Sequence, residues 1–129
     1  MRKITSFVIL IGMLLLALTA CGAGKAPEAL AVEDYLNALV TNDSSRLSAL
    51  SCADWEQSAL LELDSLQAVK VRLDGLSCSV TGTDGDTTLV TCQGKIIATY
   101  NNEDQEIDLS VRTYHVVNQG GDLLVCGYR

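Results

Sequence analysis

The chain has 129 residues, and nine Lys and Arg stand against sixteen Asp and Glu, which gives a formal net charge of −7. This length is enough for one domain with one modest hydrophobic core. An acidic chain is repelled by the phosphate backbone of nucleic acids and by anionic lipid headgroups. We therefore expect a single-domain protein that has no nucleic-acid partner.

The N-terminus has the pattern of a secretory signal. Arg2 and Lys3 precede an apolar run of twelve residues, Phe7–Leu18, and small residues follow it. A positively charged start, a short apolar segment and a small-residue end are typical of a signal peptide. The run is also shorter than the ~20 apolar residues that a permanent membrane-spanning helix needs. We therefore predict a signal peptide over residues 1–20.

The segment Leu18-Thr19-Ala20-Cys21 at the end of this signal resembles the bacterial lipobox. The resemblance implies cleavage before Cys21 and attachment of lipid, palmitate included, to its sulfur and amino group. The protein would then be a lipoprotein, held by its lipid on the extracytoplasmic face of the cell membrane or envelope. The alternative is an ordinary transmembrane anchor that ends in an unmodified thiol.

The remaining chain divides into a short spacer and one domain. We predict that residues 21–27 form the lipidated N-terminus and spacer, and that residues 28–129 form the domain. Loss of the signal removes two cations and no acid, so seven Lys and Arg remain against sixteen acids and the net charge becomes −9. The lipid would therefore hold an acidic domain that stays in the aqueous phase.

Three helices are expected in the first part of this domain. A helical spacing of apolar residues predicts the first helix over 28–41. Asp43 is placed to cap a short second helix, and Asp54 is placed to cap a third helix in which Trp55 and Leu63 share one side. The apolar face of the first helix comprises Val32, Tyr35, Leu36, Leu39 and Val40.

From about Ala68 onward the hydrophobic pattern changes to the alternation of β-strands. Turn residues separate four runs, and Gly75 interrupts the first of them where a bulge is expected. In the third run, Ile107, Leu109, Val111, His115 and Val117 fall on one side of the predicted strand. The pattern predicts an α+β fold in which three N-terminal helices pack on one face of a curved, four-stranded antiparallel sheet. The predicted strands cover about residues 69–80, 87–100, 107–117 and 124–128.

Several loose motifs resemble small bacterial lipoproteins of the NTF2-like, cystatin-like superfamily. They are Val32-x-x-Tyr35-Leu36-x-Ala38-Leu39, then Leu50-Ser51-Cys52, then a final strand that ends at Cys126. The resemblance implies a cone formed by a bent sheet wrapped on helices. It also implies functions that range from isomerases to modules that only bind a partner, so it does not define an activity.

Four cysteines remain after Cys21, and an even number in a small exported domain indicates disulfides. Cys78 and Cys92 each lie seven residues from Gly85, at the centre of a predicted hairpin, so they face each other across it. The remaining pair is Cys52 with Cys126. We predict these two bonds among the three possible connectivities. The alternative of four free thiols does not suit an oxidising compartment, and the spacings do not match a zinc site.

His115 is the one histidine of the chain and a weak catalytic candidate. It would act as a general base if it lay in the mouth of the cone. The alternative, which we favour, is a histidine in the core or in a pocket wall, because no Ser, Cys or acid forms a recognisable pair with it. The acids from Glu103 to Asp108 indicate a solvated turn rather than a cation site. We predict no catalytic residue, cofactor or metal.

The sequence thus favours a membrane-anchored, non-enzymatic module that binds an envelope protein or a small apolar ligand in the cone. One alternative is an isomerase or dehydratase of the NTF2-like type that uses His115 with a nearby Tyr or Asp. Another is a small inhibitor or accessory subunit of the cell envelope, which would use surface loops. These alternatives differ in whether the interior of the cone is open or filled.

Overall fold

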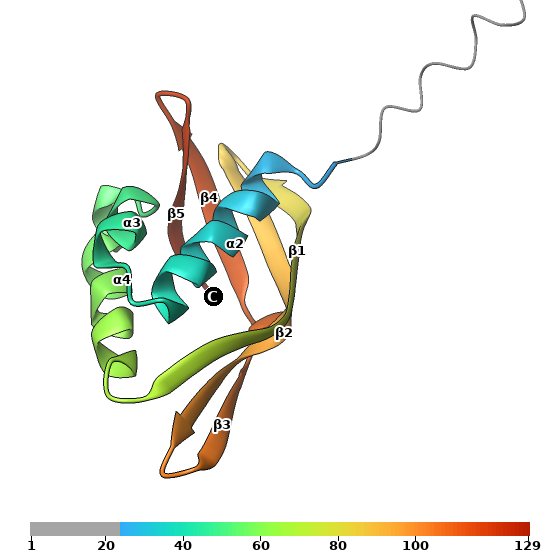
Figure 1. Ribbon diagram of the computed structural model, residues 1–129. Coiled ribbons are helices and arrows are strands. Elements are labelled where there is room, and N and C mark those ends of the chain that lie inside the picture. Colours follow the sequence, from blue (N-terminus) through green and yellow to red (C-terminus); the bar gives the residue numbers. More distant parts are fainter. Residues whose placement is uncertain (1–23) are drawn as a thin grey trace, which may run out of the picture.

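The computed structural model describes residues 24–129, so the predicted signal peptide and Cys21 lie outside the described residues. Three helices come first and five strands follow, and Figure 1 shows the helices on one side of a strongly bent sheet. None of the helices in the described range is long and apolar enough to cross a membrane. The helices are α2 (Pro27–Val40), α3 (Ser44–Ala49) and α4 (Ala53–Leu66).

Helix α2 follows the prediction closely. Pro27 stands at its start, where a missing amide hydrogen costs no helical bond, and Glu28 lies in the positively polarised first turn. The helix ends before Asn42, whose φ of 57° is one that Asn tolerates. The predicted apolar face turns towards the sheet and is buried, except for Val40, which is only partly covered. Its buried members are Val32, Tyr35, Leu36 and Leu39.

The caps of the next two helices differ from each other. The Asp43 side chain accepts a hydrogen bond from the Arg46 amide and caps α3 as predicted. The predicted cap of α4 by Asp54 is wrong, because the helix begins two residues earlier than that cap requires, with Cys52 as its N-cap and no side-chain bond. The amide of Cys52 donates to the Val125 carbonyl, so the sheet rather than a cap residue fixes this helix start.

The sheet has five strands where the sequence predicts four. Their order is β1-β2-β4-β5, and β3 pairs with β2 beyond the end of β4. The predicted third strand is split by a short 3-10 helix, η1 (Leu109–Val111), because the Asp108 side chain accepts hydrogen bonds from the amide and hydroxyl of Ser110. The strands are β1 (Lys70–Asp84), β2 (Thr87–Tyr100), β3 (Glu103–Asp108), β4 (Thr113–Gln119) and β5 (Asp122–Tyr128).

The interruption at η1 also reverses the predicted face of β4. Tyr114 and Val116 are buried against the helices, whereas His115 and Val117 lie on the opposite side of the strand. The prediction placed His115 on the same face as Ile107 and Leu109, which requires an unbroken alternation. Because three residues leave the strand at η1, the alternation restarts in another phase and this part of the prediction is wrong.

The bend of the sheet is concentrated near Gly75. The pairing of β1 with β2 shifts between Asp74 and Ser77, so the predicted bulge is present. Gly94 lies opposite, with a φ of 99°, and a Cβ placed there would stand 2.5 Å from the Asp74 carbonyl oxygen. Only a glycine allows the two backbones to approach so closely. The bend brings the sheet around α2 (Figure 1).

Two disulfides join the layers, and they are the pairs predicted from the sequence. Cys78 and Cys92 are directly opposite each other on β1 and β2. Cys52 at the start of α4 is bonded to Cys126 on β5, across a sequence separation of 74 residues. Ser51 forms a parallel bridge with Val125 beside this bond. Disulfides persist in oxidising compartments, so they fit an extracytoplasmic domain.

Candidate functional site

The space between the helices and the sheet is filled by side chains. The buried core runs from α2 across α3 and α4 to the inner face of the sheet, and its two largest members, Tyr35 and Tyr114, are fully buried. The neighbouring aliphatic side chains close the space around these two rings. The largest fully buried aliphatic residues are Leu36, Leu39, Leu47, Ile96, Leu109, Val32, Val90, Val116 and Val125.

One edge of this interior carries a polar and aromatic cluster that links α4 to the sheet. Glu62 of α4 forms an ion pair of 3.0 Å with Arg112, and both side chains are less than one-fifth exposed. The Tyr128 hydroxyl donates to the same Glu62 oxygen at 3.3 Å. The Arg112 guanidinium also lies 4.1 Å from the centre of the Tyr128 ring, which is a cation–π contact. One carboxylate on α4 therefore receives two donors, one from the residue just before β4 and one from β5.

Aromatic rings extend this cluster into the core. The Trp55 indole N–H donates to the Tyr35 hydroxyl at 3.0 Å, which joins α4 to α2. The Tyr114 ring lies 6.5 Å from that of Tyr35 and 5.4 Å from that of Tyr128, between centroids. Such edge and tilted contacts add to the burial of apolar area. We call the six residues Tyr35, Trp55, Glu62, Arg112, Tyr114 and Tyr128 the Glu62–Arg112 cluster.

Two polar atoms of the cluster are buried without a hydrogen-bond partner among the described residues. They are Oε2 of Glu62 and the hydroxyl oxygen of Tyr114. Burial raises the pKa of Tyr114 to about 12, and nearby Arg112 acts in the opposite direction without reaching hydrogen-bond geometry. Burial raises the pKa of Tyr35 as well, although the Trp55 hydrogen bond opposes the rise. Both tyrosines are therefore neutral hydroxyl groups at neutral pH.

The sequence indicated only part of this cluster. Tyr35 was expected on the apolar face of the first helix and Trp55 on one side of the third, and they lie in the core and against it, respectively. Glu62 and Arg112 are fifty positions apart in the chain, and Arg112 was expected on the polar side of a strand. No local pattern connects these two residues, because the ion pair depends on how α4 crosses the sheet. A carboxylate can accept a proton, and a neutral tyrosine hydroxyl beside it can donate one.

His115 does not belong to this cluster. It lies on the outer face of the sheet, opposite Leu89 of β2, so it is not in the mouth of the cone. There it lines a hollow of about 220 Å³ with Asp84, Leu89, Thr113 and Arg129. The structure therefore places His115 in the wall of a surface hollow, and the absence of a catalytic role stays a prediction.

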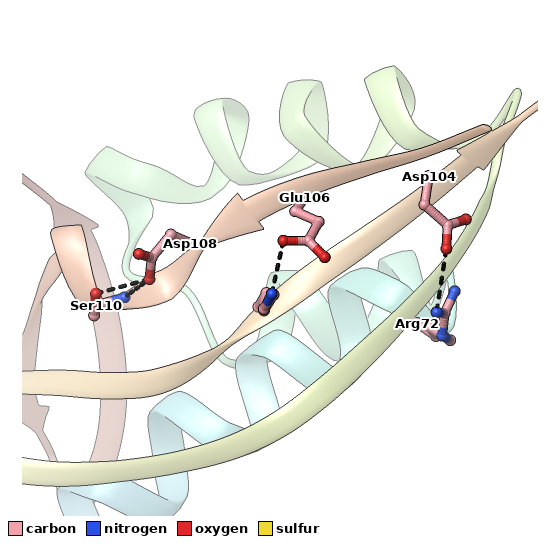
Figure 2. Close-up of polar contacts among 6 residues, drawn as sticks. Arg72, Asp104, Glu106, Asp108 and Ser110 are labelled. Atoms are coloured by element: carbon pink, nitrogen blue, oxygen red, sulfur yellow. Dashed lines mark hydrogen bonds and ion pairs between the residues drawn. The ribbon is translucent and has the colours of Figure 1, made fainter.

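The acidic residues expected in a turn instead form the edge strand β3. Figure 2 shows Asp104 directed towards Arg72 and Asp108 towards Ser110, while Glu106 is paired with Lys95. Hydrogen bonds from Thr99 and Arg72 lower the pKa of Asp104. A hollow of about 340 Å³ lies beside Lys95 and Glu106. In residues 24–129 no three His, Cys, Asp or Glu side chains come together in a way that could hold a metal ion.

Comparison with known proteins identifies the fold. No family model and no curated protein matches the sequence. Among solved structures, Aln2 from a Streptomyces species has a TM-score of 0.56 at 12% identity, over 81% of this chain and 90% of Aln2. A putative dehydratase of the NTF2-like family from Streptomyces avermitilis has a TM-score of 0.53 at 20% identity, over 77% of this chain and 88% of that one.

A third solved structure contains the fold as one part of a larger chain. It is the helical cell shape determining protein Pgp2 from Campylobacter jejuni, with a TM-score of 0.51 at 11% identity. The match covers 77% of this chain but 38% of Pgp2. At these identities the likenesses show the fold alone, which is NTF2-like, and function has to be argued from the side chains.

Proposed function

We propose that this protein is a lipid-anchored lipoprotein on the extracytoplasmic face of a bacterial cell envelope, and that its NTF2-like domain is a non-enzymatic binding or accessory module. The anchoring half of the proposal rests on Leu18-Thr19-Ala20-Cys21 behind a short apolar run. The two disulfides are consistent with that location.

The filled interior is the observation that supports a binding module. Tyr35 and Tyr114 occupy the centre of the cone with no exposed surface, and aliphatic side chains surround them. A small apolar ligand could enter only if several close-packed side chains moved, which costs free energy. We therefore favour a partner protein of the envelope, contacted through the outer surface, over a small ligand inside the cone. An inhibitor or accessory subunit acts through the same surface.

The anchoring half is tested by substitution of the acylated cysteine. Cells that express the wild-type chain are labelled with a palmitate analogue and then fractionated. We expect label and membrane association in the wild type and neither in Cys21→Ala. Gly22→Ala, which retains the thiol, serves as the matched control and should behave as the wild type. Equal membrane association of Cys21→Ala and the wild type would contradict the lipid anchor and favour a spanning segment.

The choice between a surface partner and an interior ligand is tested by thermal unfolding of the purified protein with free palmitate. A ligand at 100 times its dissociation constant adds about 2.7 kcal/mol to the stability of the form it binds. We expect no saturable rise in Tm. A rise that Leu36→Trp abolishes would show that the interior opens, and it would favour the small-ligand version of the proposal.

The Glu62–Arg112 cluster favours one second candidate, an isomerase or dehydratase of the kind suggested by the name of the Streptomyces avermitilis relative. In that case Glu62 Oε2 would accept a proton and the neutral Tyr114 hydroxyl would donate a hydrogen bond to a developing oxyanion. His115 would have no part, since it lies on the other face of the sheet.

This enzyme candidate predicts exchange of a proton next to a carbonyl group. The protein is incubated with a cyclic enone in deuterium oxide, and deuterium uptake is followed by NMR. Our proposal expects no uptake above the buffer rate. Uptake by the wild type that is lost in Glu62→Gln and retained in His115→Ala would support the enzyme and overturn the non-enzymatic module.

A further inference from the structure

The hollow beside His115 on the outer face of the sheet is lined by residues that have no part in the proposed function. Strands β1, β2 and β4 contribute to it, from Asp84 at the end of β1, together with Arg129 just after β5. Leu89 is paired with His115, and the backbones of Thr113 and Arg129 exchange two hydrogen bonds. The hollow therefore lies where these strands are adjacent, on the face opposite the buried Tyr114 and Val116. Figure 1 shows that the helices leave this side of the sheet uncovered.

The cation of this hollow differs from most other cations in the described part of the chain. Residues 24–129 contain seven Lys and Arg, and five of them form ion pairs. Arg129 is one of the two that do not, the other being Lys70. Asp84 forms neither an ion pair nor a side-chain hydrogen bond within residues 24–129. A cation and an anion thus face the same hollow without neutralising each other.

We propose that this hollow binds a small zwitterion of the amino-acid type. A guanidinium group is well suited to a carboxylate, so Arg129 would hold the carboxylate end. Asp84 would hold the ammonium end, and Leu89 would pack against the carbon atoms between them. The Thr113 hydroxyl and the His115 ring, which also line the hollow, add hydrogen-bonding groups.

Size and charge both support this class of ligand. The hollow has a volume of about 220 Å³, which leaves room for a molecule of amino-acid size. A simple anion would be repelled by Asp84 and by the net charge of the domain, and a simple cation would be repelled by Arg129. A zwitterion satisfies both groups at once. This site lies outside the cone and does not depend on the lipid anchor.

The single histidine allows a direct test. The imidazole resonances of the purified full-length protein are followed by NMR during titration with L-alanine. Propionate, which lacks the ammonium group, and ethylamine, which lacks the carboxylate, are the matched half-probes. We expect a saturable shift with L-alanine in the millimolar range and at least about tenfold weaker binding of each half-probe.

Variants assign the binding to the two charged residues of this hollow. Arg129→Gln and Asp84→Asn should each weaken L-alanine binding at least about tenfold. The same changes at the exposed pair, Arg72→Gln and Asp104→Asn, should leave binding unchanged. The proposal is overturned if no saturable shift occurs up to about 50 mM L-alanine, or if all variants bind alike. It is also overturned if the His115 chemical shift changes with the protein concentration and not with L-alanine. That result would mean that a second copy of the chain occupies the hollow.

Discussion

Strands β3 and β4 are consecutive in the chain and pair with opposite halves of the same strand, β2, yet their surroundings differ sharply. β4 is flanked by β5 and covered by helices, and Tyr114 and Val116 lie in the core. β3 is an edge strand in which only Ile107 is partly buried. Backbone pairing is thus similar in the two regions, while side-chain burial is not.

The contrast separates two sources of order in the sheet. The β4 region is held by close packing, by the Glu62–Arg112 ion pair and by a disulfide on the neighbouring strand. The β3 region is held by its backbone hydrogen bonds to β2 and by two exposed ion pairs, Lys95–Glu106 and Arg72–Asp104. Exposed ion pairs contribute little to stability, whereas buried contacts contribute much. The charges on β3 serve another purpose, since they disfavour pairing of its free edge with other chains.

The largest expected effect is the loss of the disulfide that ties α4 to β5. In the chain-entropy account, closure of a 74-residue separation contributes about 4 kcal/mol, against about 3 kcal/mol for the 14-residue separation of Cys78 and Cys92. We therefore expect Cys52→Ala with Cys126→Ala to lower the free energy of unfolding more than Cys78→Ala with Cys92→Ala. Urea unfolding measures both. A larger loss from the second pair would contradict this order.

The second largest effect is expected at the Glu62–Arg112 ion pair. Glu62→Gln leaves the Arg112 charge without its partner in a mostly covered position, so we expect a loss of about 2 kcal/mol, somewhat below that for a fully buried pair. Arg112→Met should cost a similar amount. Because each single change leaves the other charge unpaired, the double variant should lose less than the sum. Additive losses in urea unfolding would show that the pair is not coupled.

Much of this architecture could be predicted because it depends on local patterns. The helical face of Val32 and Leu36, the bulge at Gly75 and the hairpin that places Cys78 opposite Cys92 are each encoded within about twenty residues. The fold class follows from the change of period near residue 68. The lipid-bearing Cys21 stays a prediction, because it lies outside the described residues.

The errors arose where a distant contact or a side-chain bond decides the conformation. The hydrogen bonds from Ser110 to Asp108 interrupt a run whose alternation looks continuous, and they move His115 to the outer face. The start of α4 is set by the bond of Cys52 with the Val125 carbonyl rather than by Asp54. The pairing of Glu62 with Arg112 also depends on tertiary packing, so the sequence indicated only Tyr35 and Trp55 of this cluster, as residues on apolar helix faces.

A smaller effect is expected from acid at Glu33, which connects α2 to β1. Partial burial alone would raise the pKa of Glu33, but hydrogen bonds from Lys25 and from the Cys78 amide outweigh it and lower the pKa. A lowered pKa in the folded state means that the carboxylate stabilises the fold above about pH 4.5 and loses this contribution as the pH falls further. The free energy of unfolding should therefore decrease as the pH falls from 5 to 3.

Substitution isolates the contribution of this group. Glu33→Gln should lose about 1 kcal/mol at pH 7, as expected for a charge-assisted hydrogen bond, and it should have a shallower decrease between pH 5 and 3. Glu103→Gln on exposed β3 is the matched control and should follow the wild type. An identical pH dependence in Glu33→Gln and the wild type would show that another carboxylate is responsible.

The smallest effect on global stability is expected at β3, and it sharpens the contrast with β4. Lys95→Met and Arg72→Met each remove one exposed ion pair, so their urea midpoints should be close to that of the wild type. Amide hydrogen exchange should nevertheless be faster in β3 than in β4 already in the wild type, because β3 has one neighbouring strand and few buried contacts. The two variants should accelerate exchange in β3 and leave β4 unchanged. Equal protection of the two strands would mean that they open together with the whole domain, and the edge strand would then be as stable as the covered one.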